Sequence, residues 1–167
     1  MKKTGLILAC FAVMALLIPS VFACYECGKV TGGGHTRIGS RVETPAGSFG
    51  FNAMCTKNGL KGELQYVDHT TGDKVHAHEL DFLEVWEENP PNKPYPMKYA
   101  YFGGPCTFNH EDGYTFRVLV EDNGEPGKED RFTIEVKLGA DVVLFGGSLD
   151  DPMLVGNIQT HKPMPGI

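Results

Sequence analysis

The chain lacks the concentrated basic charge that nucleic acids and anionic membranes attract. Its 167 residues include 15 Lys and Arg residues against 21 Asp and Glu residues, for a formal net charge of −6. Nucleic-acid binding needs a basic face, and a polybasic segment is the electrostatic route to an anionic lipid surface. The composition therefore predicts no nucleic-acid partner and no electrostatic attachment to a membrane.

Sequence motifs of catalysis are also absent. The chain has no G-x-S-x-G elbow, no H-E-x-x-H motif and no Gly-rich stretch paired with a phosphate-binding lysine. We therefore predict that the protein is not an enzyme and carries no cofactor. Carboxylate pairs of the glycosidase kind stay open at this level, because their pairing is spatial. A metal or redox enzyme is a weaker alternative.

The first residues have the features of an export signal. Lys2 and Lys3 precede an apolar run without charge, residues 6–18, and a small residue, Ala23, ends the segment. This pattern predicts a signal peptide over residues 1–23, with a membrane anchor over the same stretch as the alternative. We accordingly expect an extracytoplasmic protein that is secreted, periplasmic or lipid-anchored at the cell envelope.

Four cysteines follow the predicted cleavage site, and Cys10 leaves with the signal. An even number in an exported chain indicates disulfides. Of the three connectivities we favour Cys24–Cys27 with Cys55–Cys106, because a C-x-x-C pair closes locally. Residues 21–24 also resemble a bacterial lipobox, in which Cys24 would be acylated and form the sole membrane anchor. A redox C-x-x-C and a zinc site are further alternatives.

The clearest structural signal is a β-hairpin over residues 114–138. Apolar residues alternate with polar ones on both sides of a turn-rich segment, residues 122–130, which contains Asn-Gly and Pro-Gly. The two apolar rows are Phe116, Val118 and Val120, and Phe132, Ile134, Val136 and Leu138. This period of two directs both rows toward a common core.

Further short strands are expected along the chain, with turns between them. The expected strands are 48–55, 60–69, 74–87, 98–109 (broken by Gly103-Gly104), 142–145 and 154–160, after a loop or irregular first strand over 28–48. No internal repeat and no convincing helix cap occurs. The pattern predicts an all-β fold, a single antiparallel β-sandwich or small barrel of about 8–9 short strands. The predicted organisation is 1–23 signal peptide, 24–47 Gly-rich segment, 48–162 β-sandwich domain and 163–167 frayed tail.

An ordered set of short motifs resembles the post-COAP domain, a small β-rich module of exported bacterial proteins. The motifs are Gly32-Gly33-Gly34, 48–52, 62–69, 72–76, 113–116, 122–127 with Asp130 and Phe132, and 156–159. They span nearly the whole mature chain, and each alone is a turn or strand motif of low specificity. The resemblance implies an extracytoplasmic β domain without catalytic residues. His35 stands where that pattern has an aromatic residue, and the four cysteines are not part of it.

Two groups of residues are candidate metal ligands. Imidazoles of His69, His76 and His78 would suit zinc or copper if they converged, although hydrogen bonds that brace the turn after Asp68 are the simpler interpretation. The oxygens around the hairpin turn would suit calcium, but their spacing departs from the EF-hand template. These oxygen donors include Asp122, Asn123, Glu125 and Asp130.

Aromatic residues supply the remaining candidate site. Trp86, Tyr95, Tyr99 and Tyr101 would favour carbohydrate binding if they formed an exposed row on one sheet face, although aromatics at strand spacing are more often core. We therefore expect an exported, non-catalytic β module with a structural or binding role at the cell envelope. Its expected partner is an unidentified protein or glycan, and carbohydrate- or calcium-binding is the alternative function.

Overall fold

The structure, a computed structural model, describes residues 28–37, 45–89, 97–153 and 155–161. All regular structure in these ranges is β-strand, and every strand pair is antiparallel. The strands are β1 (Lys29–Arg37), β2 (Pro45–Thr56), β3 (Gly59–Asp68), β4 (Lys74–Ala77), β5 (Phe82–Glu88), β6 (Met97–Phe108), β7 (Glu111–Asp122), β8 (Arg131–Leu138), β9 (Asp141–Ser148) and β10 (Val155–His161). The prediction of an all-β antiparallel fold is confirmed.

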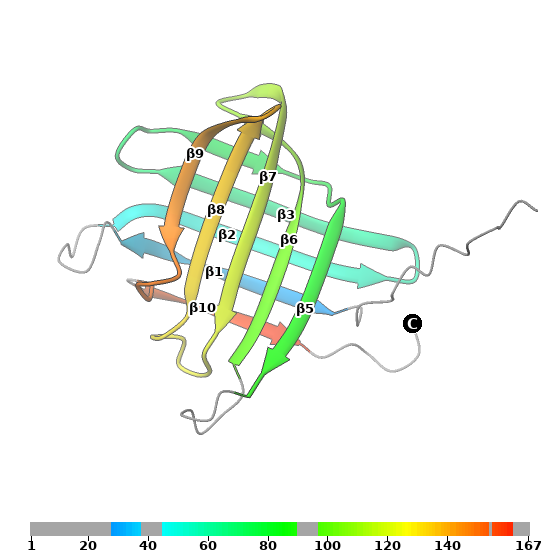
Figure 1. The fold of residues 1–167 in the computed structure, drawn as a ribbon, viewed down its shortest axis with the longest axis vertical. Helices are drawn as coiled ribbons and strands as arrows, with labels where there is room; N and C mark the ends of the chain where they lie inside the picture. Colours follow the sequence, from blue (N-terminus) through cyan, green and yellow to red (C-terminus); the bar gives the residue numbers. More distant parts are fainter. Residues whose placement is uncertain (1–27, 38–44, 90–96, 154, 162–167) are drawn as a thin grey trace, which may run out of the picture.

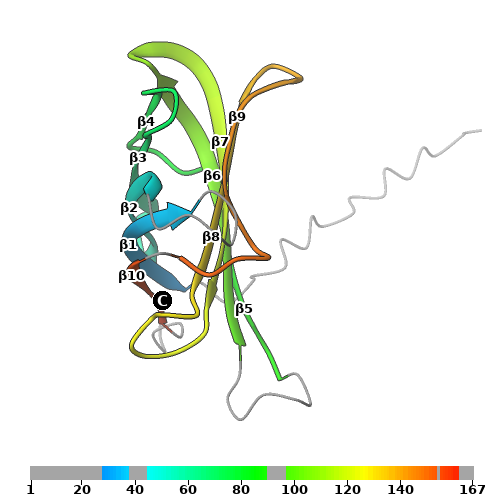
Figure 2. The same ribbon diagram turned by 90° about the vertical axis from the view of Figure 1, so that its left-hand side faces the viewer.

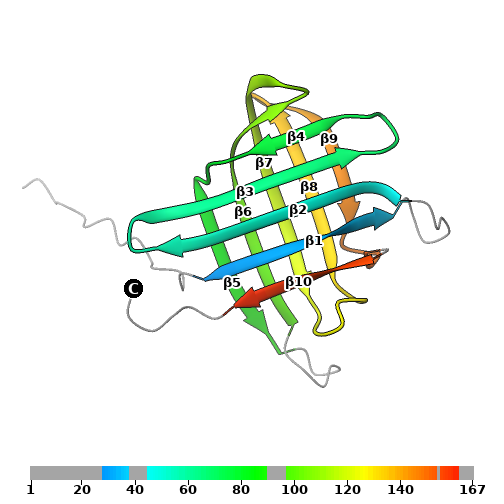
Figure 3. The same cartoon turned by 180° about the vertical axis from the view of Figure 1, so that it is seen from behind.

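The ten strands form one strongly curled sheet, a half-barrel (Figure 1). Its order is β10-β1-β2-β3-β4-β6-β7-β8-β9, and β5 pairs with β6 off this path. Figure 2 shows that the sheet folds into two layers, with β10, β1, β2, β3 and β4 in one and β5 to β9 in the other. The strands of the two layers cross steeply (Figure 3), and the layers join where β4 pairs with β6.

Residues 74–87 form two strands rather than the single irregular strand predicted. Apolar residues change parity in the sequence between Ala77 and Leu80, and this change falls where the chain leaves β4 in the first layer and enters β5 in the second. Leu83 and Val85 are the β5 residues that pack against the core. Of the two expectations for the Gly-rich start of the chain, the strand is correct, because residues 29–37 form β1 between β2 and β10, with a register irregularity between Thr36 and Arg37.

Gly103 and Gly104 do not interrupt β6, which continues through both residues. Their role is close packing rather than a break. A Cβ atom on Gly103 would collide with the carbonyl oxygen of Phe116, and one on Gly104 would lie 2.7 Å from the carbonyl oxygen of Glu79. The sequence pattern could not distinguish these two uses of glycine, because both place Gly inside an apolar stretch.

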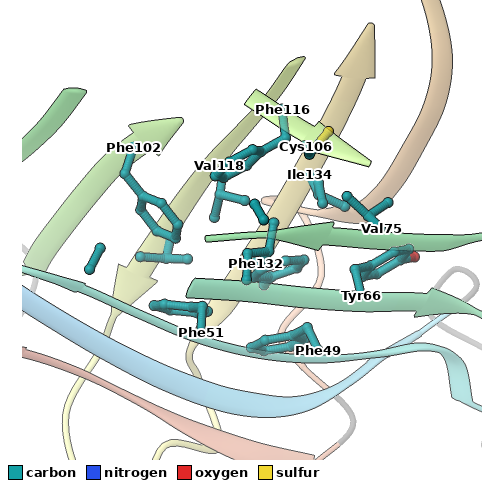
Figure 4. Packing of buried hydrophobic residues seen from close by; sticks show 14 of the residues in the cluster. Phe49, Phe51, Tyr66, Val75, Phe102, Cys106, Phe116, Val118, Phe132 and Ile134 are labelled. Carbon is teal, nitrogen blue, oxygen red and sulfur yellow. The ribbon is translucent and has the colours of Figure 1, made fainter. Parts of the chain in front are cut away.

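The core lies between the two layers and contains stacked aromatic rings (Figure 4). The rings of Phe49 in the first layer and Phe132 in the second are parallel, with centroids 3.9 Å apart. Phe51 and Phe102 make a second contact across the layers, with centroids 5.0 Å apart. The fully buried large side chains are Tyr66, Phe102, Phe116, Phe132, Leu64, Ile134, Ile158, Val30, Val118, Val120, Val136 and Asp130.

The predicted hairpin is confirmed as β7 and β8, which pair from Thr115↔Lys137 to Glu121↔Arg131. Six of the seven predicted apolar positions are buried. Leu138 is the exception, since it is 49 % exposed at the last position of β8, beside the turn to β9. Period-two alternation therefore identified the inward face but not the end of the buried region.

Candidate functional site

The cysteine prediction fails at Cys106. This thiol is free and buried, and burial raises its pKa to about 11. The predicted Cys55–Cys106 bridge is therefore wrong: Cys106 lies on β6 in the second layer, whereas Cys55 lies on β2 in the first. Cys55 is not a free thiol either. Cys24 and Cys27 lie outside the described residues.

The predicted histidine trio does not converge. The rings of His76 and His78 meet edge to face with centroids 4.2 Å apart. His69 instead lies near His35, with ring centroids 6.4 Å apart. Across the described parts of the chain, no group of three His, Cys, Asp or Glu side chains is placed to hold a metal ion. Asp68 braces the turn after β3, as the simpler interpretation expected, by accepting backbone N–H bonds from residues 70 and 71.

Two carboxylates proposed as calcium ligands bind the backbone of β10 instead. The Oδ2 atom of Asp130 accepts the N–H of Ile158 at 2.7 Å, and its Oδ1 accepts the N–H of Asn123 at 2.9 Å. The Oδ2 atom of Asp122 accepts both the N–H and the hydroxyl of Thr160, at 2.8 and 2.9 Å. Ile158 and Thr160 are alternate residues of an antiparallel strand, so their N–H groups face the same edge.

A third carboxylate, Glu125, completes this arrangement from the β7–β8 connection. Its Oε1 accepts hydrogen bonds from Gln159 at 2.6 Å and from Asn157 at 3.1 Å. We call the three side chains Asp122, Glu125 and Asp130 the hairpin clamp. An edge strand with unpaired N–H groups is a template for aggregation. The hairpin clamp accepts such N–H groups of β10, which gives these acidic residues a structural role.

The electrostatics of the clamp fit this role. Desolvation by burial, which outweighs hydrogen bonds from Ile158 and Asn123, raises the pKa of Asp130 to about 6, and the charges of Asp122 and Glu125 act in the same direction. Hydrogen bonds from β10 side chains lower the pKa of Glu125. Asp130 is completely buried, so it faces β10 rather than any ligand.

Aromatic side chains gather on the outer surface of β5 and β6, although they are half-buried rather than the exposed row that the carbohydrate interpretation required. Trp86 and Tyr99 are direct cross-strand neighbours whose rings stack at 5.2 Å and 12°. Phe82 and Tyr101 make a second contact with centroids 4.9 Å apart. All four side chains are half-buried, and none belongs to the core. We call these four residues the aromatic face; Tyr95 lies outside the described residues.

Charged side chains occupy the next positions in the cross-strand row that begins with Trp86 and Tyr99. Glu121 on β7 and Arg131 on β8 follow in register, and the guanidinium of Arg131 donates to Glu121 at 2.9 Å. Burial and the neighbouring carboxylate of Glu121 raise the pKa of Tyr99. The indole N–H of Trp86 donates to Glu88 at 3.3 Å. The Nε atom of Arg131 is buried and has no hydrogen-bond partner. This cross-strand row therefore contains both flat aromatic rings and an unsatisfied donor.

Comparisons with known proteins identify no relative: no family model matches the chain, and neither does a curated protein or a solved structure. The resemblance to the post-COAP domain therefore stays a prediction. Within the described ranges, no helical segment has the length and hydrophobicity to span a bilayer.

Proposed function

We propose that the protein is an exported, non-catalytic module of the cell envelope that binds carbohydrate on its aromatic face. The observation that carries this proposal is the parallel stack of Trp86 and Tyr99 on the outer surface of β5 and β6. The face of an aromatic ring is negative, and the C–H groups on the flat side of a sugar ring pack against it. Trp86 is half-buried rather than core, so part of the indole is exposed to solvent.

The polar neighbours of the aromatic face suit hydroxyl groups. The exposed carboxylate of Glu88 is an acceptor, and the half-buried guanidinium of Arg131 is a donor. Apolar rings beside a few convergent polar groups are the usual composition of a ligand site. Calcium binding is less well supported, because the oxygens of Asp122 and Asp130 accept hydrogen bonds from backbone N–H groups.

Export and attachment belong to the same proposal. The signal-like residues 1–23 and the lipobox-like sequence before Cys24 support secretion, with acylation of Cys24 as the alternative. A disulfide from Cys55 to Cys24 or Cys27 replaces the bridge to Cys106. A backbone hydrogen bond supports this disulfide. The N–H of Cys55 donates to the carbonyl of Gly28 at 3.1 Å, and Gly28 follows Cys27 directly in the chain.

Trp86 is the only tryptophan of the chain, so its fluorescence reports directly on the proposed site. The mature protein is screened by affinity electrophoresis in gels that contain soluble β-glucan, xylan, mannan or chitosan, and titrated with oligosaccharides of the polymer that retards it. We expect a saturable change of Trp86 fluorescence. Trp86→Ala should weaken binding at least about tenfold, because buried aromatic anchors contribute more than 1 kcal/mol at binding sites.

The control is Phe145→Ala, which removes a ring that is 66 % exposed on β9, the opposite edge of the same layer. Retardation should be unchanged in this variant. Absence of retardation and of any fluorescence change across all four polymers would refute the proposal and leave a structural role. Equal losses for Trp86→Ala and Phe145→Ala would also refute it, since binding would then not depend on the aromatic face.

A further inference from the structure

The outer surface of the first layer has a polar hollow over β2 and β3. Inward residues such as Phe49 and Phe51 alternate with small or polar outward ones. The outward residues are Ser48, Gly50 and Asn52 on β2, which pair in register with Val67, Gln65 and Glu63 on β3. These residues line a hollow of about 470 Å³. A second hollow of about 630 Å³ shares Asn52 and Glu63 with it, so the two form one groove.

Packing does not explain Gly50, which lies in the floor of the hollow, or its neighbour Gly33. Gly33 on β1 and Gly50 on β2 are direct neighbours in register. A Cβ atom on Gly50 would meet nothing within 4 Å, and one on Gly33 would make only an ordinary contact at 3.5 Å. Every other described glycine has either a positive φ or a neighbouring atom at 3.0 Å or less from such a Cβ.

Glycine inside a strand weakens it, because the chain loses more entropy and has no side chain to pack. Such a glycine often marks a place where a ligand or another backbone approaches closely. No described residue of the protein approaches the outer side of Gly50. We propose that the polar hollow is a second binding site, and that it takes a neutral, hydroxyl-rich ligand, a saccharide.

The lining chemistry selects this class of ligand. Ser48, Asn52 and Gln65 carry hydroxyl and amide groups, which both donate and accept hydrogen bonds, as sugar hydroxyls do. Glu63 adds an acceptor, and the 470 Å³ hollow has no Lys or Arg in its lining, whereas Lys61 lines the adjoining 630 Å³ hollow. An anionic ligand in the 470 Å³ hollow would therefore lose hydration without gaining a cationic partner from that lining. The glycine floor lets a flat ring rest directly on the backbone.

The polar hollow and the aromatic face lie on opposite outer surfaces of the molecule, since they belong to different layers (Figures 2 and 3). Binding at the hollow uses none of the aromatic residues, so the inference goes beyond the proposed function and does not depend on it. A module with both sites could hold two glycan segments at once, one on each side of the half-barrel.

The test is an NMR titration of the mature protein carrying Trp86→Ala, which removes the aromatic site. Neutral oligosaccharides from β-glucan, xylan and mannan are the probes. We expect shifts of the backbone amide of Gly50 and of the side-chain amides of Asn52 and Gln65. Adding Gly50→Leu should abolish the shifts of the Asn52 and Gln65 side-chain amides, because the leucine occupies the hollow. This loss should persist at ligand concentrations up to tenfold above the dissociation constant of the Trp86→Ala protein.

Gly50→Leu should leave the fold intact, since Gly50 has no positive φ and open space above it. The melting temperature should be equal or higher, as expected when glycine is replaced at a compatible strand position. Thr115→Leu is the matched control, because it places the same side chain on an exposed strand position of the other layer. The inference is wrong if no oligosaccharide shifts the hollow resonances, or if Gly50→Leu binds as well as Thr115→Leu.

Discussion

Replacing Asp130 by alanine should strongly destabilise the fold. The carboxylate is completely buried and accepts the N–H groups of Ile158 and Asn123 at 2.7 and 2.9 Å. Alanine leaves both donors buried without an acceptor. Each unsatisfied group costs about 1–3 kcal/mol. Relief of the desolvated charge, which the raised pKa of Asp130 puts at roughly 3 kcal/mol at pH 7, offsets part of the loss, so we expect a net decrease of up to about 3 kcal/mol in the free energy of unfolding at that pH.

Urea unfolding followed by circular dichroism measures this difference. Glu129→Ala is the control, because its exposed side chain precedes Asp130 in the chain and should change the stability by less than about 0.5 kcal/mol. An unchanged or increased stability for Asp130→Ala would refute the reasoning, since β10 would then be held without the clamp.

The same carboxylate predicts a pH dependence of known sign. Its pKa is raised from 3.8 to about 6 in the folded protein, so the folded state binds the proton more tightly than the unfolded chain does. Its contribution to stability is therefore greatest at acidic pH and falls as the pH rises from about 4 to 6. A shift of this size corresponds to roughly 3 kcal/mol.

Asp130→Asn, which cannot ionise, isolates this effect. The stability of the wild type relative to this variant should decrease between pH 4 and pH 6 and then remain constant. Asp122 and Glu125 carry charges that act on Asp130, and comparison of the two proteins at each pH cancels most of their contribution. A relative stability that stays flat or rises over that range would contradict the assigned direction.

Two further predictions concern the core and the cysteines. Phe132→Ala removes the ring that stacks on Phe49 and should lower the free energy of unfolding by about 3–5 kcal/mol, measured by urea unfolding; a loss near 1 kcal/mol would show that the stack is dispensable. Cys106, whose pKa is raised to about 11 by burial, should resist iodoacetamide at pH 8 in the folded protein and react after unfolding. Peptide mapping should find Cys55 alkylated only after reduction, and labelling of Cys106 at the native rate of an exposed thiol would refute its burial.

The sequence predicted the parts of the fold that depend on local pattern. The hairpin of β7 and β8 was evident because both strands alternate and the turn between them contains Asn-Gly. Trp86, Tyr99 and Tyr101 were recognised as a candidate row, and strand pairing indeed places Trp86 beside Tyr99. The exposure of the row could not be read from the sequence, since it depends on which face of β5 packs on the core.

The failures involve partners far apart in the chain. Asp122 and Asp130 suggested calcium because their hydrogen-bond donors on β10 lie 38 and 28 residues away, respectively. Cys55 and Cys106 were paired by elimination, without knowledge of the layers to which they belong. Gly33 and Gly50 belong to Gly-rich motifs that indicate a loop or an ordinary strand, and only the register of β1 and β2 reveals that they are neighbours.

The pairing of β1 with β10 has a consequence for how the chain folds. β1 is the first of these strands to be synthesised, and β10, which pairs with its outer edge, is the last. Loop closure over such a separation is slow compared with the formation of neighbouring hairpins, so this closure should be the final step. Before β10 pairs with β1, the carboxylates of Asp122 and Asp130 lack the N–H donors that β10 supplies. A chain that ends before residue 155 therefore lacks both its closing strand and the donors that make these acidic residues tolerable in the interior.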